Sequence, residues 1–413
     1  MKVEAQSASV QLDADIVRFF NDPVFYQTAH HPGGLFDRLR AIDPVYRSAA
    51  GVWMITGFDA AQSALRDANF SMRQAALETA QLTFDAPAGE LYLSRMGTRD
   101  GADHTRMRKL ATPSFHPPGV RDWFPVIDTL LEEILDEVAA RGRVELVSQV
   151  ARELPKRFIC RMLGIPTSEL PRLEHWVIGL IARRNVASAT DTRAEMSQLM
   201  LEFAAFLREF ADERRKHPGR DVITQLIQAH DTGESLNDNE LLAFCQELIS
   251  GGVDTTANVI ASGIWLLLNR PEQLAAWRAE PGLIAGAVEE ILRFEPATLY
   301  GHPRQVSKEI NLAGRGIPPN ERIIVAIAGA NRDPARFEDP HRFDLRRKPV
   351  SHLGFGFGAH FCLGAQIARA EIVATLTRFF QRFPRIELEP ETFRWSDHPR
   401  MHGPGQYYVT CMA

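Results

Sequence analysis

Phe355-Gly-Phe-Gly-Ala-His-Phe-Cys-Leu-Gly364 is the stretch that indicates the fold and the chemistry of this chain. It places Cys362 in a loop rich in glycine, and the residues that follow run on as an expected helix toward Pro384. Glycines let the backbone approach a flat group and turn amide hydrogens toward sulfur. A helix N-terminus beside the sulfur favours the thiolate. These are the requirements of a thiolate that binds the iron of a macrocycle, so Cys362 is predicted to be a metal ligand.

Three other interpretations of this loop are weaker. A buried structural cysteine would not need so many glycines. A zinc site could use His352, His360 and Cys362, but no fourth ligand lies at a suitable local spacing. The segment 354–359 fits a permissive dinucleotide-binding pattern, yet it lies near the end of the chain with no parallel unit after it.

The motif Phe-x-x-Gly-x-His-x-Cys-x-Gly resembles the haem-binding signature of the cytochrome P450 family. This resemblance implies a mainly α fold with small β-sheets (α+β), in which haem, as heme b (iron protoporphyrin IX), lies between a long oxygen-binding helix and the cysteine-loop helix. The resemblance to the family extends from the segment 103–108 to the C-terminal strands. It assigns the iron ligand to Cys362, and Phe355 is expected to shield the sulfur.

Composition and charge fit this interpretation. The 413 residues are 45% hydrophobic and 24% charged, which is typical of a globular protein. The formal net charge of −5 argues against a nucleic-acid binder. Four widely spaced cysteines form no disulfide framework, and the N-terminus resembles neither a signal peptide nor a membrane anchor. We therefore expect a cytoplasmic protein without a membrane partner, folded as one domain over residues 1–413.

Periodicity predicts a mostly helical chain. Helices are expected over residues 126–141, 194–216 and 222–230, and a hairpin is expected from residues 44–47 and 52–56. Further β structure is expected at three places near the C-terminal end of the chain, namely residues 309–312, 322–326 and 407–410.

The segment 237–269 predicts one continuous helical rod. Asn237 and Glu240 form a capping-box start, and Pro271 is a stop. At about 1.5 Å per residue the rod would be roughly 45 Å long. Its apolar residues are interrupted by polar ones, so it is expected to be a buried helix and not a membrane span.

Within this rod, the sequence Gly251-Gly-Val-Asp-Thr-Thr256 resembles the oxygen-binding pattern of the same family. Two glycines inside a helix cost about 1 kcal/mol each relative to alanine, but Gly251 would make room for dioxygen and let the helix open. The resemblance implies that Thr255 faces the iron and steers protons, and that Asp254 relays them from solvent. The alternatives are a Thr255 hydroxyl bonded to the carbonyl of residue 251 and an Asp254 held in an ion pair.

The resemblance also implies further cofactor and structural contacts. Haem propionates need cations or donors, and the family pattern assigns this role to His104, Arg108, Arg304 and His360, with His302 as a less secure addition. The pair Glu290-x-x-Arg293 is expected to lock onto a later arginine, matched here to Arg342 in Asp339-Pro-His-Arg-Phe343.

The sequence also offers candidates for the residues that bind the substrate and for the face that binds the electron donor. Glu247 lies one turn before Gly251, so we hypothesise that Glu247, Thr298 and Tyr300 recognise a polar or cationic group on a mainly apolar small molecule. A solvated or arginine-paired Glu247 is the alternative. A ferredoxin and its ferredoxin reductase are expected to supply electrons. Basic residues on the cysteine side of the haem could form the docking face, namely Arg106, Lys109 and Arg121.

The expected function is that of a haem-thiolate monooxygenase, an oxidoreductase that hydroxylates a small organic substrate, such as a natural-product intermediate, with dioxygen. The alternatives are a peroxide-using enzyme, a desaturating or ring-coupling oxidase, and a non-catalytic haem-binding sensor. The pair Asp254 and Thr255 favours dioxygen activation over all three.

Overall fold

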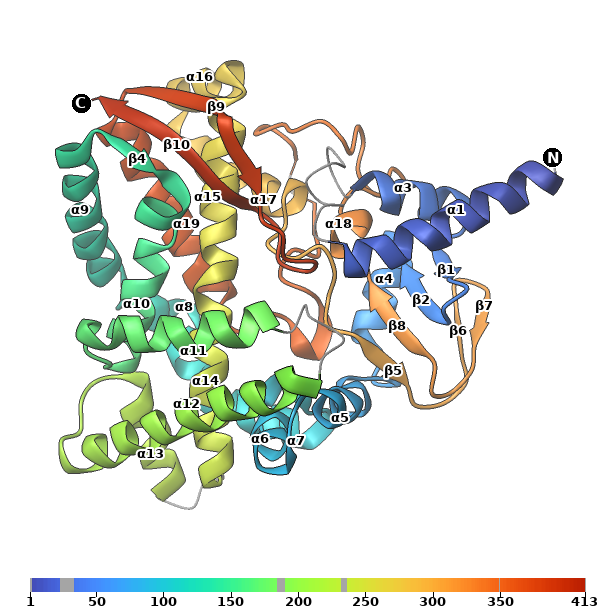
Figure 1. Cartoon of the computed structure of the whole chain (residues 1–413). Helices are drawn as coiled ribbons and strands as arrows, with labels where there is room; N and C mark the ends of the chain where they lie inside the picture. Colours follow the sequence, from blue (N-terminus) through green and yellow to red (C-terminus); the bar gives the residue numbers. More distant parts are fainter. Residues whose placement is uncertain (1, 23–32, 184–189, 232–235, 349, 413) are drawn as a thin grey trace.

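The structure is a computed structural model that describes residues 2–22, 33–183, 190–231, 236–348 and 350–412. Figure 1 shows a large helical part and a smaller part that contains most of the short strands and the N-terminal helix. The α-helices are α1 (Lys2–Asn21), α3 (Gly33–Ile42), α4 (Phe58–Arg66), α5 (Met72–Thr83), α6 (Ala86–Leu93), α7 (Gly101–Phe115), α8 (Pro117–Arg121), α9 (Phe124–Arg141), α10 (Glu153–Leu163), α11 (Leu170–Arg183), α12 (Thr190–Lys216), α13 (Val222–Asp231), α14 (Asp238–Gly252), α15 (Asp254–Leu268), α16 (Pro271–Ala279), α17 (Ile284–Phe294), α18 (Ile327–Ala330) and α19 (Ala365–Arg382).

The strands form three small sheets, with the orders β1-β2-β8-β5-β3, β4-β10-β9 and β6-β7. The predicted hairpin is confirmed, because β1 and β2 pair antiparallel with Val45 opposite Ile55. The three later stretches of expected β structure lie in β6, β8 and β10. The strands are β1 (Val45–Arg47), β2 (Val52–Ile55), β3 (Phe70–Ser71), β4 (Arg143–Glu145), β5 (Arg304–Val306), β6 (Ile310–Leu312), β7 (Arg315–Ile317), β8 (Arg322–Val325), β9 (Arg385–Trp395) and β10 (Pro404–Met412).

The helices predicted from periodicity are confirmed as α9, α12 and α13. The prediction of one continuous rod over residues 237–269 is wrong. The capping box of Asn237 and Glu240 does start α14, but the helix is interrupted at Val253, whose φ and ψ are −88° and −71°. The glycines just before Val253 remove the side chains that would favour regular helix there. α15 continues after this one-residue break.

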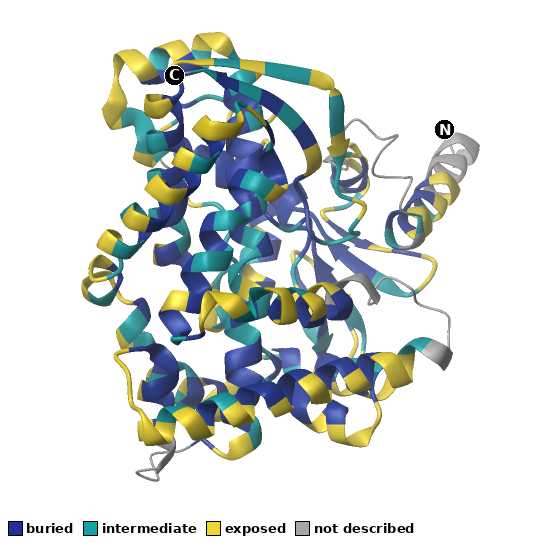
Figure 2. Ribbon diagram, turned by 60° about the vertical axis from the view of Figure 1, so that its left-hand side comes forward, coloured by how far each residue is buried: buried dark blue, intermediate teal, exposed yellow. Residues whose placement is uncertain are grey.

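α15 forms the centre of the helical part (Figure 1). Most residues of α15 are buried, among them Ile260, Ile264 and Leu267, and the interior ribbon of Figure 2 is correspondingly dark blue. A Cβ added at Gly263 would lie 3.1 Å from Ile291 Cδ1 of α17 and 3.4 Å from Leu376 Cδ2 of α19. The three helices therefore pack closely, and this packing fixes α15 relative to the loop that precedes α19. No helix of the described part is both long and apolar enough to cross a bilayer.

The ion-pair network around Glu290 corrects one expectation. Arg293 donates from Nε and Nη2 to the two carboxylate oxygens of Glu290, at 2.7 and 2.8 Å, and both side chains are buried. The later arginine in this network is Arg347, whose Nε lies 3.1 Å from Glu290 Oε2, and not Arg342. The Arg342 side chain is 65% exposed, and Arg342 contributes only its carbonyl oxygen, which accepts from Arg293 and Arg347.

This network predicts different effects of two neighbouring substitutions. Arg347→Leu should lower the free energy of unfolding by about 1.5–3 kcal/mol, because hydrogen bonds to a buried carboxylate and to loop carbonyls are lost. Arg342→Leu should change it by less than about 0.5 kcal/mol, since its side chain is exposed. Urea titration of both variants measures this. An equal loss from Arg342→Leu would contradict the assignment.

Candidate haem-thiolate site

The cysteine loop folds back on itself. The amide of Cys362 donates to the carbonyl of Phe355 at 2.9 Å, and a short 3₁₀ turn covers Gly358–His360. Gly356 and Gly358 have φ values of +71° and +75°, a region that other residues rarely adopt. A Cβ on Gly358 would also lie 2.6 Å from the carbonyl oxygen of Leu65. The glycines therefore set the path of the backbone that presents Cys362.

Cys362 lies deep among protein atoms and still has exposed surface. Burial raises the pKa of its thiol, while the Gly364 amide and the cations Arg108 and Arg369 lower it. Gly251 is also exposed although α14 lies in the interior, and nothing would contact a Cβ added there within 4 Å. Accessible residues inside the molecule indicate internal space beside them. A metal ion would complete the stabilisation of the thiolate, which makes this donor set suitable for iron.

The residues predicted to bind propionates gather around one carboxylate. Asp100 lies 3.4 Å from His360 Nε2 and acts electrostatically on His104 and Arg304. The rings of His104 and His360 are 4.2 Å apart between centroids. Arg108 acts on His104 and on Cys362. The structure thus brings together groups from α7, β5 and the cysteine loop.

One polar atom of this cluster lacks a hydrogen-bond partner among the described residues. His104 is 2% exposed, and its Nε2 atom has no hydrogen-bond partner among the described residues. Burial, with the nearby charges of His360 and Arg108, lowers the pKa of His104 to about 4. Burial also lowers the pKa of Arg304 to about 10. A bound carboxylate would give His104 Nε2 a partner and balance the charge of the buried Arg304, so the residues present fit the propionates of haem. His302 instead contacts Arg400, at 2.9 Å.

Asp100 itself was not foreseen from the sequence. It accepts hydrogen bonds from the Ser71 hydroxyl at 2.7 Å and from the amides of Met72 and Arg73 at 3.2 and 2.9 Å. Although burial opposes it, hydrogen bonding to His360 and to these donors holds the pKa of Asp100 well below its ordinary value. Asp100 therefore ties the start of α5 to His360. Asp100 lies about one helical turn before His104, and this spacing is the feature of the sequence from which its role could have been predicted.

At the start of α15, Thr255 and Asp254 make the two contacts that we considered as alternatives. The Thr255 hydroxyl donates to the carbonyl of Gly251 at 2.6 Å. Asp254 accepts from Nε of Arg152 at 3.0 Å and also from its Nη2. The Asp254 side chain is 12% exposed and that of Arg152 37% exposed. This ion pair therefore links an interior carboxylate to a guanidinium that solvent reaches, and Arg152 was missed by sequence reasoning.

The candidate substrate residues contact different partners in the structure. Glu247 Oε1 accepts from the amide of Gly97 at 2.9 Å, and its Oε2 is buried without a partner among the described residues. Burial raises the pKa of Glu247, and the charge of Arg95 opposes this. Tyr300 packs against Phe20, with ring centroids 5.4 Å apart, and Thr298 forms a bridge with Met401. Substrate recognition by these residues stays a prediction.

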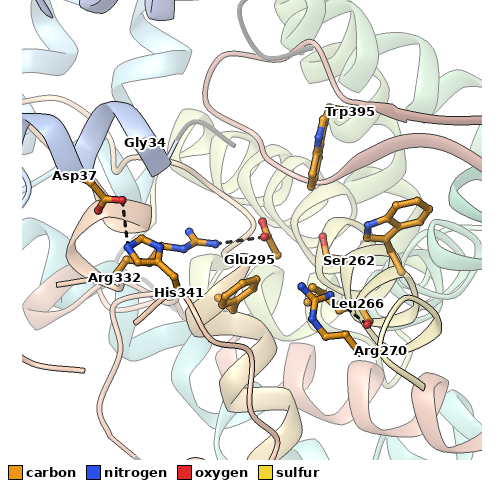
Figure 3. Close-up of a pocket in the computed structure, with 11 residues that line it drawn as sticks. Gly34, Asp37, Ser262, Leu266, Arg270, Glu295, Arg332, His341 and Trp395 are labelled. Carbon is orange, nitrogen blue, oxygen red and sulfur yellow. Dashed lines mark hydrogen bonds and ion pairs between the residues drawn. The ribbon is translucent and has the colours of Figure 1, made fainter. Parts of the chain in front are cut away.

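A separate cavity of about 450 Å³ lies along the second half of α15 and the residues after it (Figure 3). Ser262, Leu266 and Arg270 line it from α15 and the residues after it, and Arg332 faces Glu295 across it at 3.3 Å. None of its described lining residues belongs to the predicted site. This cavity is therefore distinct from the space beside Cys362.

Comparisons with known proteins agree with this geometry. The model of the family Cytochrome P450 matches residues 169–405. The chain belongs to the cytochrome P450 family. Cytochrome P450 107B1 of Saccharopolyspora erythraea is 33% identical over 402 residues, covering 94% of this chain and 96% of that protein. Nocardicin C N-oxygenase of Nocardia uniformis subsp. tsuyamanensis is 34% identical over 402 residues, covering 95% and 97%.

The fold of this P450 is shared by solved structures. The crystal structure of CalO2 has a TM-score of 0.87 at 27% identity and covers 92% of this chain and 96% of its own. That of P450BioI with a ligated acyl carrier protein has a TM-score of 0.85 at 29% identity, covering 92% and 98%. The predicted fold class is confirmed. The P450 is a monooxygenase-type oxidoreductase, as its relatives are.

The glycine loop yields a prediction for haem binding. Gly358→Ala should lose most bound haem, because the positive φ and the Leu65 carbonyl leave no room for a Cβ. Gly282→Ala is the matched control, since Gly282 has an ordinary φ and nothing would contact its Cβ within 4 Å. The ratio of Soret to protein absorbance of the purified variants measures haem content. Full retention in Gly358→Ala would refute this role of the loop.

Proposed function

We propose that this P450 hydroxylates a small organic molecule, an intermediate of natural-product biosynthesis, with electrons from a separate ferredoxin and ferredoxin reductase. The observation that carries the proposal is the accessible Cys362 together with a cluster of basic side chains in which the buried His104 Nε2 has no partner among the described residues. The names of relatives support the substrate class. Mycinamicin IV hydroxylase/epoxidase of Micromonospora griseorubida is 32% identical over 90% of this chain.

The cofactor is proposed to be heme b, whose iron Cys362 would hold and whose propionates His104, Arg108, Arg304 and His360 would bind. Bound haem supplies the activation of dioxygen and the oxidation of substrate. The chain's own contribution on the cysteine side is electrostatic. Arg108 acts on Cys362, and the loop amides hold the sulfur in place.

On the other side, Thr255 and Asp254 are proposed to hold and move protons. The Thr255 hydroxyl donates to the Gly251 carbonyl in this structure, and rotation about its side chain would turn its Oγ1 toward the space beside Gly251. Asp254 carries a carboxylate bound to the solvent-accessible Arg152. Release of Arg152 would open a path along which Asp254 Oδ1 takes up a proton from solvent.

The docking of the electron donor is proposed to use the exposed side chains of Lys109 and Arg121 on α7 and α8. α7 is also the helix from which Arg108 acts on Cys362, so an acidic partner bound there would lie on the cysteine side. Arg106 is engaged by Glu240 at 2.7 Å and is less available than the other two.

The first test is the spectrum of the reduced protein with carbon monoxide. The wild type should show the shifted Soret band of a thiolate-bound haem, and Cys362→Ala should lose it because the axial sulfur is gone. Cys411→Ala, which removes a buried thiol from the C-terminal sheet, should keep the band. A wild-type protein without this band would overturn the proposed function.

A second test concerns the proton residues. With ferredoxin and its reductase as electron source, Asp254→Asn should lower kcat by about 100-fold, the usual scale for loss of a proton-transfer group.

Thr255→Val should consume oxygen with little product. Thr256→Val is the matched control, because this neighbouring hydroxyl lies in the buried part of α15. Product formed per oxygen consumed is the measurement, and equal values for Thr255→Val and wild type would exclude the role of Thr255.

A further inference from the structure

A cluster of three ionisable side chains contacts the start of the cysteine loop and has no part in the proposed proton path. Arg369 of α19 donates from Nε and Nη2 to Glu289 of α17, at 2.6 and 2.9 Å. His352 Nε2 lies 3.1 Å from the same carboxylate. We call Arg369, Glu289 and His352 the Glu289 cluster. It joins two core helices to the segment that leads into the loop.

The Glu289 cluster contacts the loop at its start. The other ring nitrogen of His352, Nδ1, accepts from the amide of Gly354 at 3.0 Å. A Cβ on Gly354 would lie only 2.8 Å from the carbonyl oxygen of Leu292. The backbone of Gly354 is therefore held between His352 and α17. Because the ring of His352 is bonded on both sides, its orientation fixes where the loop begins.

The Glu289 cluster also contacts the aromatic residue beside the sulfur. Cζ of Arg369 lies 4.5 Å from the centroid of the Phe355 ring, within the range of a cation–π interaction. The carbonyl of Phe355 in turn accepts from the amide of Cys362. One arginine therefore packs on the ring of the residue whose backbone holds the cysteine.

Charge makes this arrangement more than a mechanical support. Arg369 and Arg108 are the two cations that act on the Cys362 sulfur. The carboxylate of Glu289 is bound to Arg369 by two hydrogen bonds and offsets part of its field. The side chains of Arg369 and Glu289 are 27% and 34% exposed, so solvent does not fully screen them. The sulfur thus lies in the field of a cation that is partly neutralised.

We propose that the Glu289 cluster sets the electron affinity of the haem that Cys362 binds, with Arg369 and Glu289 as positioning residues of opposite effect. Positive charge near the thiolate favours the reduced iron and negative charge favours the oxidised iron. This inference rests on the haem binding of the proposed function. It assigns to Arg369 and Glu289 a role in how readily the enzyme accepts its first electron.

A purely structural role for the Glu289 cluster makes a different prediction. If Arg369 and Glu289 only anchored α19 to α17, removal of either partner would loosen the loop in the same way. Both variants would then change in the same direction, or would lose haem together. The sign of the effect therefore separates the two roles.

The experiment is a potentiometric titration of the Soret band of the holoenzyme. Arg369→Met should shift the midpoint potential to a more negative value, and Glu289→Gln should shift it to a more positive one. Arg378→Met is the matched control, because Arg378 lies on the same helix but pairs with Asp128 and Glu132 of α9. Its potential should equal that of the wild type.

Shifts of the same sign, or no shift in Glu289→Gln, would overturn the inference. If Arg369→Met does not retain haem, Arg369→Lys replaces it, and this variant keeps the charge and should give a potential closer to that of wild type than the Glu289→Gln value. The carbon monoxide spectrum of the wild type is recorded first. A missing thiolate band there refutes the proposed function, whereas a normal band with unshifted variants refutes only the role of the Glu289 cluster.

Discussion

A sulfur that must carry negative charge inside the protein is the constraint on which the other features depend. Burial opposes the thiolate of Cys362, and an isolated buried charge would be costly. The negative charge of the sulfur is stabilised by the Gly364 amide and by two arginines from different helices. The backbone of the loop follows a path that favours glycine. α15, α17 and α19 pack tightly, and this packing holds α19, which carries Arg369 and begins just after Gly364. The core is therefore also the support of the site.

The sequence allowed good predictions where the information was local. The helix that follows Cys362, the capping box of Asn237 and the hairpin of β1 and β2 each lie within a short segment, so spacing and residue type were enough. His104 and Arg108 were placed correctly relative to each other for the same reason, because they lie one turn apart on α7.

Partners that come from distant segments could not be predicted in this way. Arg342 and Arg347 lie in one short loop, and only the fold decides which guanidinium reaches Glu290. Arg152 is 102 positions from Asp254, and no periodic pattern relates them. The interruption at Val253 is a different case. The glycines indicated a weak point, but hydrophobic periodicity continues across it, and periodicity alone cannot distinguish a straight rod from two helices in line.

The Nε2 atom of His104 is buried and has no hydrogen-bond partner among the described residues, and this affects the stability of the protein before haem binds. A newly made chain must bury this nitrogen before a ligand satisfies it, and this lowers the stability of the haem-free form. A ligand that binds only the folded state stabilises it in proportion to the logarithm of its concentration. The supply of haem in the cell would then govern how much of this enzyme survives proteolysis, so that cofactor availability sets abundance as well as activity.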